Sequence, residues 1–280
     1  MIELVISGGD SFTFGAELET EVPHLPNPNS WANLVANKIG ARHINTARSA
    51  RGNSYIVRHV MHQVLAALNK GIASDKIFVQ IMWTFANRHD FALAVDHDQW
   101  DSPWFGITPY TAEDESKSDW FKRVAPDTPH YREVKQHLHE SYLKNLKIGV
   151  VDFAKNFVST VQARNLYDSY TSAAAVLQLQ DFLTLREISY LFTYVDQHAL
   201  NGIATDAHSD PGSKYLNSLR KEIKFNNWYN FSGSMGFLEW ARYNNYEFAT
   251  SHPLELAHID AADMIYNYIV NEGIISNDSR

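Results

Sequence analysis

Short apolar runs alternate with helix-like stretches along the first third of the chain. Short segments typical of strands lie at positions 4–7, 42–46 and 77–83. Between them, apolar residues recur at helical spacing over 31–39 and 56–68, and a glycine follows each stretch where a helix should end. The run at 77–83 is almost continuously apolar, as expected for a strand buried on both faces. This order predicts parallel βαβ units with right-handed crossovers, and therefore an α/β fold with a mainly parallel sheet.

The pattern changes near Asp96, where Asp, Ser and Pro become frequent and periodicity is lost. Helical spacing returns over 132–162 and 169–186, and the apolar run at 190–195 indicates that the sheet resumes there. Further helices are predicted over 214–223, over 236–243 and through Ile269 near the end of the chain.

We therefore predict a single domain over 1–280 that contains a helical and loop-rich insertion, or lid, over 96–188. Three tryptophans, Trp100, Trp104 and Trp120, lie in the irregular part of this insertion. They could line an acyl or sugar pocket as part of a lid, or they could form a small satellite core beneath the insertion.

Composition and charge narrow the class of protein. With 280 residues, 45% of them hydrophobic and 20% charged, the chain is long and apolar enough for one large globular domain. A formal net charge of -8 disfavours a broad phosphate-binding face, so nucleic acid is not expected as a partner.

The chain has no cysteine, which excludes a disulfide framework, a thiol nucleophile and a thiolate metal site, and fits a reducing compartment. No segment approaches the ~20 consecutive apolar residues that span a bilayer, and the start lacks a basic region followed by a long apolar one. A cytoplasmic protein without membrane attachment is predicted. The pattern carries no signature of an oligomeric state.

The first predicted strand ends abruptly at a turn that carries a hydroxyl group. Residues 5–15 read VISGGDSFTFG, so that Ser11 follows an apolar run and two glycines. Gly52 and Asn87 lie in loops that follow the next two predicted strands. Because functional sites in open parallel sheets collect beyond the carboxyl ends of the strands, we expect these three loops to converge.

A serine hydroxyl becomes a good nucleophile only when a base takes its proton, and the resulting oxyanion needs preset hydrogen-bond donors. The backbone N–H groups of Ser11 and Gly52 and the side-chain amide of Asn87 could supply three such donors. Arg88, beside Asn87, could bind a substrate carboxylate or form a surface ion pair.

Three stretches of the sequence resemble conserved blocks of the SGNH (GDSL-type) hydrolases. GDSFTFG is similar to the block that carries the nucleophile, and TARSARGNSYIVRHV to the block that carries a glycine. SHPLELAHIDAAD, near the end of the chain, resembles the block that carries the catalytic histidine. The resemblance implies a flavodoxin-like three-layer α/β/α sandwich with a mainly parallel sheet. Some large tailed bacteriophages carry similar proteins, which suggests a phage origin.

The resemblance also implies roles for individual residues. Ser11 would be the nucleophile and His252 the general base, with Gly52 and Asn87 in the oxyanion hole and His258 as a structural partner. The implied activity is serine ester hydrolysis of an acyl or acetyl group on a small molecule or glycan. Neither a cofactor nor a metal is implied.

Two positions depart from the family pattern. The asparagine block usually reads Gly-x-Asn-Asp, whereas this chain has MWTFANRHDF, so Thr84 is an alternative to Asn87 in the oxyanion hole. The family commonly places an aspartate three residues before the catalytic histidine, where this chain has Ala249. Without that aspartate, Glu247, Ser251 or a backbone carbonyl would orient the His252 imidazole. Alternatively, Ser11 and His252 would act without an acid, and catalysis would be slower.

Other interpretations of the same residues stay open. His252 could serve as part of a helix start with Pro253 in its first turn, and Gly52 and Asn87 could be ordinary loop residues. The protein would then be a weakly active or inactive module that binds glycan or serves in an assembly. A metal-dependent hydrolase is the third possibility, although no recognised zinc-binding spacing occurs among the histidines and acids, which include His89, Asp90, Asp96, His97, Asp98, His137 and His139.

Overall fold

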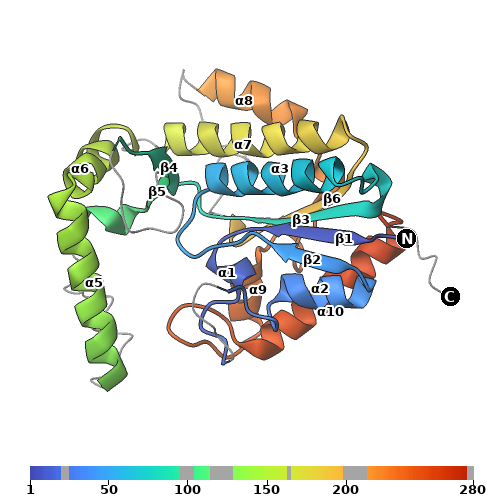
Figure 1. Cartoon of the computed structure of the whole chain (residues 1–280), viewed down its shortest axis with the longest axis horizontal. Helices are drawn as coiled ribbons and strands as arrows, with labels where there is room; N and C mark the ends of the chain where they lie inside the picture. Colours follow the sequence, from blue (N-terminus) through green and yellow to red (C-terminus); the bar gives the residue numbers. More distant parts are fainter. Residues whose placement is uncertain (20–24, 95–103, 114–128, 163–164, 198–212, 276–280) are drawn as a thin grey trace.

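Four parallel strands form the central sheet of the protein. The computed structural model describes residues 1–19, 25–94, 104–113, 129–162, 165–197 and 213–275. The strands are β1 (Leu4–Gly8), β2 (Arg42–Asn45), β3 (Ile77–Trp83) and β6 (Ser189–Tyr194), in the order β2-β1-β3-β6. All three pairings are parallel, so the carboxyl ends of the strands meet at one edge of the sheet (Figure 1).

Helices cover both faces of this sheet. One face packs against α3 (Asn53–Asn69) and α7 (Leu166–Thr184), with α8 (Ser213–Glu222) outside α7 (Figure 1). The other face packs against α2 (Trp31–Ile39), α9 (Phe237–Tyr243) and α10 (Glu255–Asn271). The predicted three-layer α/β/α architecture is therefore confirmed.

The side chains of the central strands alternate between two hydrophobic cores. In β3, Val79 and Ile81 belong to the core under α3 and α7, whereas Phe78 and Met82 belong to the core over α2 and α10. All residues of this strand are buried. An apolar residue is favoured at nearly every position because each face of the strand is covered, which explains the continuous run in the sequence.

The predicted strands and helices are present, with ends that differ by a few residues, but three local features differ from prediction. The turn after β1 contains a short helix, α1 (Ser11–Phe14). The helix expected over 132–162 is two helices, α5 (Pro129–Lys147) and α6 (Val150–Thr160), because Gly149 between them has a left-handed φ of 79°. The irregular region contains an antiparallel hairpin, β4 (His89–Ala92) and β5 (Trp104–Ile107). Single 3₁₀ turns occur at Ser74–Lys76, Pro109–Ala112 and Phe225–Asn227.

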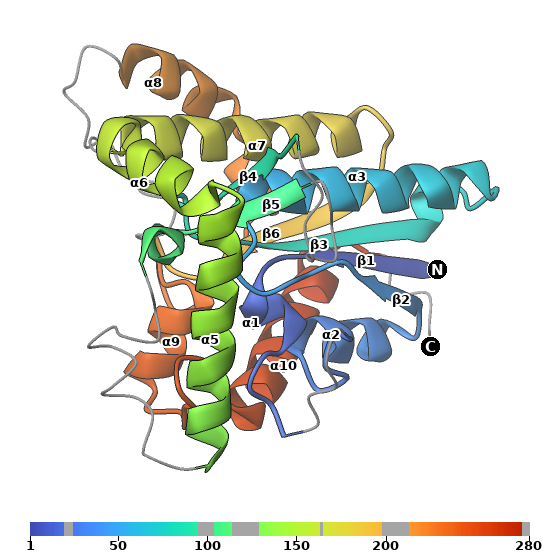
Figure 2. The same ribbon diagram turned by 60° about the vertical axis from the view of Figure 1, so that its left-hand side comes forward.

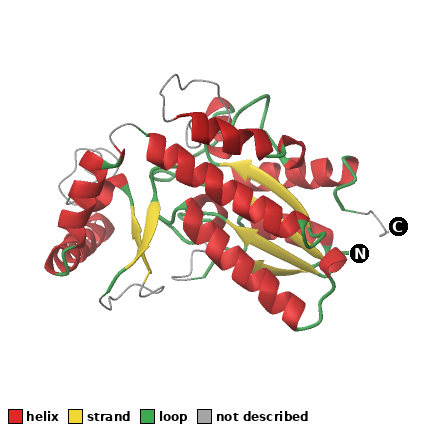
Figure 3. Cartoon of the chain, turned by 90° about the horizontal axis from the view of Figure 1, so that it is seen from above, coloured by secondary structure: helices red, strands yellow, loops and turns green. Residues whose placement is uncertain are grey.

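The range predicted as an insertion contains two structurally different parts. The hairpin and α6 share a small core, formed mainly by Phe105, Ile107, Val150 and Ala154, that is separate from the two large ones. These elements and α5 lie beyond the carboxyl edge of the sheet (Figures 2 and 3). In contrast, α7 belongs to the main core. The insertion boundaries and the single domain stay predictions.

Of the three tryptophans of the insertion, only Trp104 lies among the described residues. Its ring faces the Arg58 guanidinium, whose central carbon is 3.9 Å from the ring centroid, so it contacts α3. Trp100 and Trp120 fall outside the described residues. Among the helices that the structure describes, none has the length and apolar character needed to cross a membrane.

The sheet packs tightly on α3 at Gly8, the last residue of β1. A Cβ at this position would lie 2.6 Å from Val60 Cγ2 and 2.9 Å from Ile56 Cγ2. We expect Gly8→Ala to lower the free energy of unfolding by about 1–3 kcal/mol, measured by urea denaturation, because the core has no room for the methyl group. Val60→Ala removes one clashing methyl group. The double variant should therefore be more stable than the sum of the two single effects predicts, and strict additivity would contradict the packing argument.

Candidate active site

Local sequence explains why Ser11 lies at the end of the first strand. Gly9 allows a close turn, since a Cβ there would lie 2.0 Å from Thr13 Oγ1. Asp10 then caps α1, its side chain accepting a hydrogen bond from the Phe12 N–H at 3.0 Å. Ser11 is therefore the first residue of a short helix at the carboxyl edge of the sheet.

The structure brings Ser11 and His252 together from opposite ends of the chain. Ser11 Oγ lies 2.8 Å from His252 Nε2, although 241 positions separate the two residues. The Phe12 ring packs against the imidazole with a centroid separation of 4.6 Å. A short turn holds the histidine, because Ala249 N–H donates to the His252 carbonyl and Phe248 pairs with Pro253. This is the geometry of a serine hydroxyl poised to pass its proton to a base.

A carboxylate that the sequence analysis did not single out holds the other side of the imidazole. Glu17 Oε2 lies 2.9 Å from His252 Nδ1 and also accepts hydrogen bonds from the backbone N–H groups of Ser251 and His252. Of the groups proposed from the sequence, Ser251 is also near, with its Oγ 3.1 Å from Nδ1. Glu247 is exposed.

The environment of Glu17 keeps its carboxyl group ionised. Partial burial by itself raises the pKa of Glu17, but the hydrogen bonds from the His252 side chain and the Ser251 backbone and the charge of His252 bring this pKa to about 2. Because an ionised carboxylate only accepts hydrogen bonds, Nδ1 of His252 must carry a proton. In the neutral ring, Nε2 is then free to accept the proton of the Ser11 hydroxyl.

Glu17 also has an unusual backbone conformation, with a left-handed φ of 68°. For a residue with a long side chain this conformation is strained, and such strain is common at functional sites. Nothing in the sequence pattern marks the residue, because it lies in a turn without a motif and 235 positions from its histidine partner.

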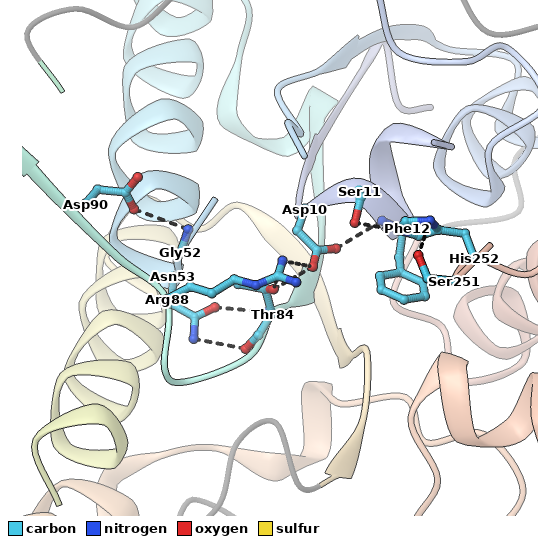
Figure 4. A network of polar contacts seen from close by, with 10 residues as sticks. All are labelled: Asp10, Ser11, Phe12, Gly52, Asn53, Thr84, Arg88, Asp90, Ser251 and His252. Carbon is cyan, nitrogen blue, oxygen red and sulfur yellow. Dashed lines mark hydrogen bonds and ion pairs between the residues drawn. The ribbon is translucent and has the colours of Figure 1, made fainter. Parts of the chain in front are cut away.

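A second polar network lies next to Ser11 and is centred on Asp10 (Figure 4). The buried Asp10 carboxylate accepts from Thr84 Oγ1 at 2.5 Å and from Arg88 Nη1 at 2.8 Å. Thr84 is held in turn by Asn53, whose amide oxygen accepts from the Thr84 N–H and whose amide nitrogen donates to the Thr84 carbonyl. The network therefore joins the segments that follow β1 and β3 to the start of α3, as expected for an edge where parallel strands end.

The structure gives the other two predicted site residues different surroundings. Gly52 N–H donates to Asp90 Oδ2 at 3.2 Å, and a Cβ at this glycine would lie 2.3 Å from the Arg88 carbonyl oxygen. The side chain of Asn87 is exposed, and its backbone carbonyl accepts from Gln162. Their places in an oxyanion hole stay predictions, as does the role of Thr84, whose hydroxyl group is bonded to Asp10.

Asp90 explains why Gly52 and Asn53 take these positions. Its carboxylate accepts from the N–H groups of Gly52 and Tyr55 and from Ser54 Oγ, so it caps the start of α3 from the neighbouring hairpin. Burial raises the pKa of Asp90, although the charges of Arg51 and Arg58 oppose this shift. The cap comes from β4, a strand that the sequence analysis did not predict.

The second histidine of the C-terminal block, His258, lies in the core. Its Nδ1 accepts from the Trp31 N–H at 3.0 Å, which ties α10 to the start of α2. Burial lowers the pKa of His258 to about 3, so the ring is neutral at physiological pH.

The described residues contain no group of three or more histidines and acids arranged to hold a metal ion. His89 pairs with Asp168, with Nε2 and Oδ1 2.8 Å apart. Of the other candidate ligands in the sequence, those at 96–98 lie outside the described residues, and His137 and His139 lie on α5.

Comparison with known proteins finds similarity at the level of structure. No family model matches the chain, and no curated protein matches its sequence. A lipolytic protein of the G-D-S-L family from Veillonella parvula is 11% identical, with 95% of this chain and 99% of that chain covered and a TM-score of 0.41. The acetyl xylan esterase AlAXEase is 12% identical, with coverage of 95% and 100% and a TM-score of 0.41.

The acetyl xylan esterase Est2A from Butyrivibrio proteoclasticus is also 12% identical, with 98% of this chain and 65% of that chain covered and a TM-score of 0.44. The chain is thus similar to G-D-S-L and acetyl xylan esterase structures over nearly its whole length at low sequence identity. At these values the similarity assigns neither a family nor an activity.

The Glu17 interaction predicts a pH-dependent contribution to stability. Its folded-state pKa of about 2 lies below the ordinary value of 4.5, so ionised Glu17 stabilises the fold above pH 4.5, and this contribution is lost as the pH falls from 4.5 toward 2. After allowance for solvent screening, we expect Glu17→Gln to lower the free energy of unfolding at pH 6 by on the order of 1–2 kcal/mol. Urea denaturation should show a smaller difference from wild type at pH 3.

Glu247→Gln is the matched control, since Glu247 is an exposed glutamate close to the same turn. It should follow the wild-type pH dependence. A difference between wild type and Glu17→Gln that stays constant from pH 6 to pH 3 would contradict the ionised interaction with His252.

Proposed function

We propose that the protein is a serine hydrolase that cleaves an acyl or acetyl ester of a small molecule or glycan through an acyl-enzyme on Ser11. The observation that carries this proposal is the arrangement of three side chains. Ser11 Oγ lies 2.8 Å from His252 Nε2, and Glu17 Oε2 lies 2.9 Å from His252 Nδ1. A nucleophile, a base and a carboxylate that orients the base are the parts that acyl transfer to serine requires.

In the first half of the reaction, Ser11 Oγ bonds to the carbonyl carbon of the ester while its proton passes to His252 Nε2. The tetrahedral intermediate then collapses, the bond from carbon to the alcohol oxygen breaks, and the imidazolium returns the proton to the leaving oxygen. In the second half, His252 takes a proton from water, the hydroxide oxygen bonds to the acyl carbon, and the free acid leaves as Ser11 regains its proton. The steps require no cofactor and no metal.

Glu17 supplies the carboxylate that an aspartate at position 249 would provide in the family pattern. Its carboxylate fixes the tautomer of His252 and stabilises the imidazolium that forms in both halves of the reaction. This acid lies in the turn after α1, whereas an aspartate at position 249 would lie in the same turn as the histidine.

The oxyanion needs donors aimed at the same point in space. We assign the backbone N–H of Ser11 to this role, together with Gly52 and Asn87. Gly52 N–H donates to Asp90 and Asn87 is exposed, so this proposal requires both groups to turn toward the substrate oxygen.

The positions of Gly52 and Asn87 also favour a second candidate function. A protein whose oxyanion donors do not assemble would keep the serine and histidine but turn over slowly, and would act as a glycan-binding or assembly module. If purified protein hydrolyses no p-nitrophenyl ester above background while it binds glycans on an array, the second candidate is correct.

Labelling with a fluorophosphonate tests the leading proposal. The reagent should form an adduct located on Ser11 by mass spectrometry, and Ser11→Ala should abolish both the adduct and turnover of p-nitrophenyl acetate. Glu17→Gln should lower kcat by about 10²–10⁴-fold, because the imidazole loses its orientation and its charge partner. Glu247→Gln should leave the rate unchanged. Turnover that is indifferent to Ser11→Ala would end this proposal.

A further inference from the structure

Asp10 presents an electrostatic problem for the proposed reaction. Its side chain is fully buried, and it directly precedes the nucleophile in the chain. A bare carboxylate at this position would repel the negative charge that develops on the substrate oxygen at Ser11. Removing water from the site would strengthen this repulsion, because buried charges are poorly screened.

Capping alone does not explain why the residue is an acid. Asp10 Oδ1 accepts from the Phe12 N–H and so begins α1. Asparagine caps a helix about as well as aspartate does, so the capping role calls for an oxygen and not for a charge. The second oxygen, Oδ2, is the one that engages the loop after β3, through Thr84 and Arg88.

Arg88 supplies the compensating charge. Its Nη1 lies 2.8 Å from Asp10 Oδ2 and 3.2 Å from Thr84 Oγ1, and its side chain is only 17% exposed. The guanidinium also lies over the Phe85 ring, 4.7 Å from the centroid, which keeps it in this place. Because the two opposite charges lie this close together and are largely buried, their combined electrostatic effect at Ser11 is small.

We propose that Arg88 is a positioning residue that neutralises Asp10, so that the oxyanion forming at Ser11 develops beside an ion pair and not beside a bare carboxylate. This inference rests on the proposed function. It assigns the charge of Arg88 to Asp10 and not to a substrate carboxylate, because the guanidinium already has an ionised partner.

The charge-balance argument predicts that a second substitution repairs the first. Removing one member of a buried ion pair leaves an uncompensated charge, whereas removing both charges does not. Arg88→Met should therefore lower kcat/KM for p-nitrophenyl acetate by about 10–100-fold, with the loss in kcat. Asp10→Asn combined with Arg88→Met should be at least about tenfold faster than Arg88→Met alone. Arg88→Lys, which keeps the charge but loses the planar contact with Phe85, should retain more activity than Arg88→Met.

A purely structural role of Arg88 gives the opposite result. If the arginine only holds the loop after β3, the double variant loses more contacts and should be as slow as Arg88→Met or slower, which would overturn the proposal. A loss confined to a p-nitrophenyl ester that carries a carboxylate would also overturn it, since Arg88 would then bind substrate. Should Arg88→Met fail to fold, the double variant decides: activity within about tenfold of wild type supports charge balance, and any larger loss contradicts it.

Wild-type protein is the control that separates this inference from the proposed function. If wild type forms no ester-derived adduct on Ser11, the proposed function is wrong, and the role of the ion pair in that reaction is wrong with it. If wild type reacts at Ser11 but Arg88→Met reacts equally fast, only the role of Arg88 is wrong.

Discussion

The hydrogen bond between Ser11 and His252 depends on the whole fold, because it joins the end of the first strand to the turn before the last helix. Its 2.8 Å distance requires α10 to lie against α2 and the same face of the sheet as α1. The bond between buried His258 and the Trp31 N–H fixes α10 in this place. A parallel sheet makes the meeting possible because all its strands end at one edge.

Three acids near this edge have different partners, and the partner decides what each acid does. Glu17 binds a histidine and stays ionised, so it can orient a base. Asp10, which directly precedes Ser11 in the chain, forms an ion pair with Arg88. Asp90 caps α3 through backbone N–H groups and thereby places Gly52 and Asn53. Each carboxylate is buried or half-buried, so each needs donors or a cation to offset the cost of leaving water.

The short segment between β3 and β4 connects the site to the elements outside the main sheet. It carries Thr84 and Arg88 toward Asp10. At its other end, His89 pairs with Asp168 of α7, and the Asn87 carbonyl accepts from Gln162, next to the end of α6. A few hydrogen bonds therefore link the residues beside Ser11 to α7 and to the end of α6.

The sequence by itself determined the layers of the fold, since periodicity is local. It also singled out Ser11 and His252 as candidate site residues, since both lie in recognisable blocks. It did not reveal Glu17, because no spacing rule relates an acid in one turn to a histidine 235 positions later. It also did not reveal that Asp90 engages Gly52, because that contact depends on a hairpin without a clear alternating pattern. Hydrogen-bond partners distant in sequence are selected by packing, so only the tertiary structure decided which acid contacts the His252 imidazole and which arginine pairs with Asp10.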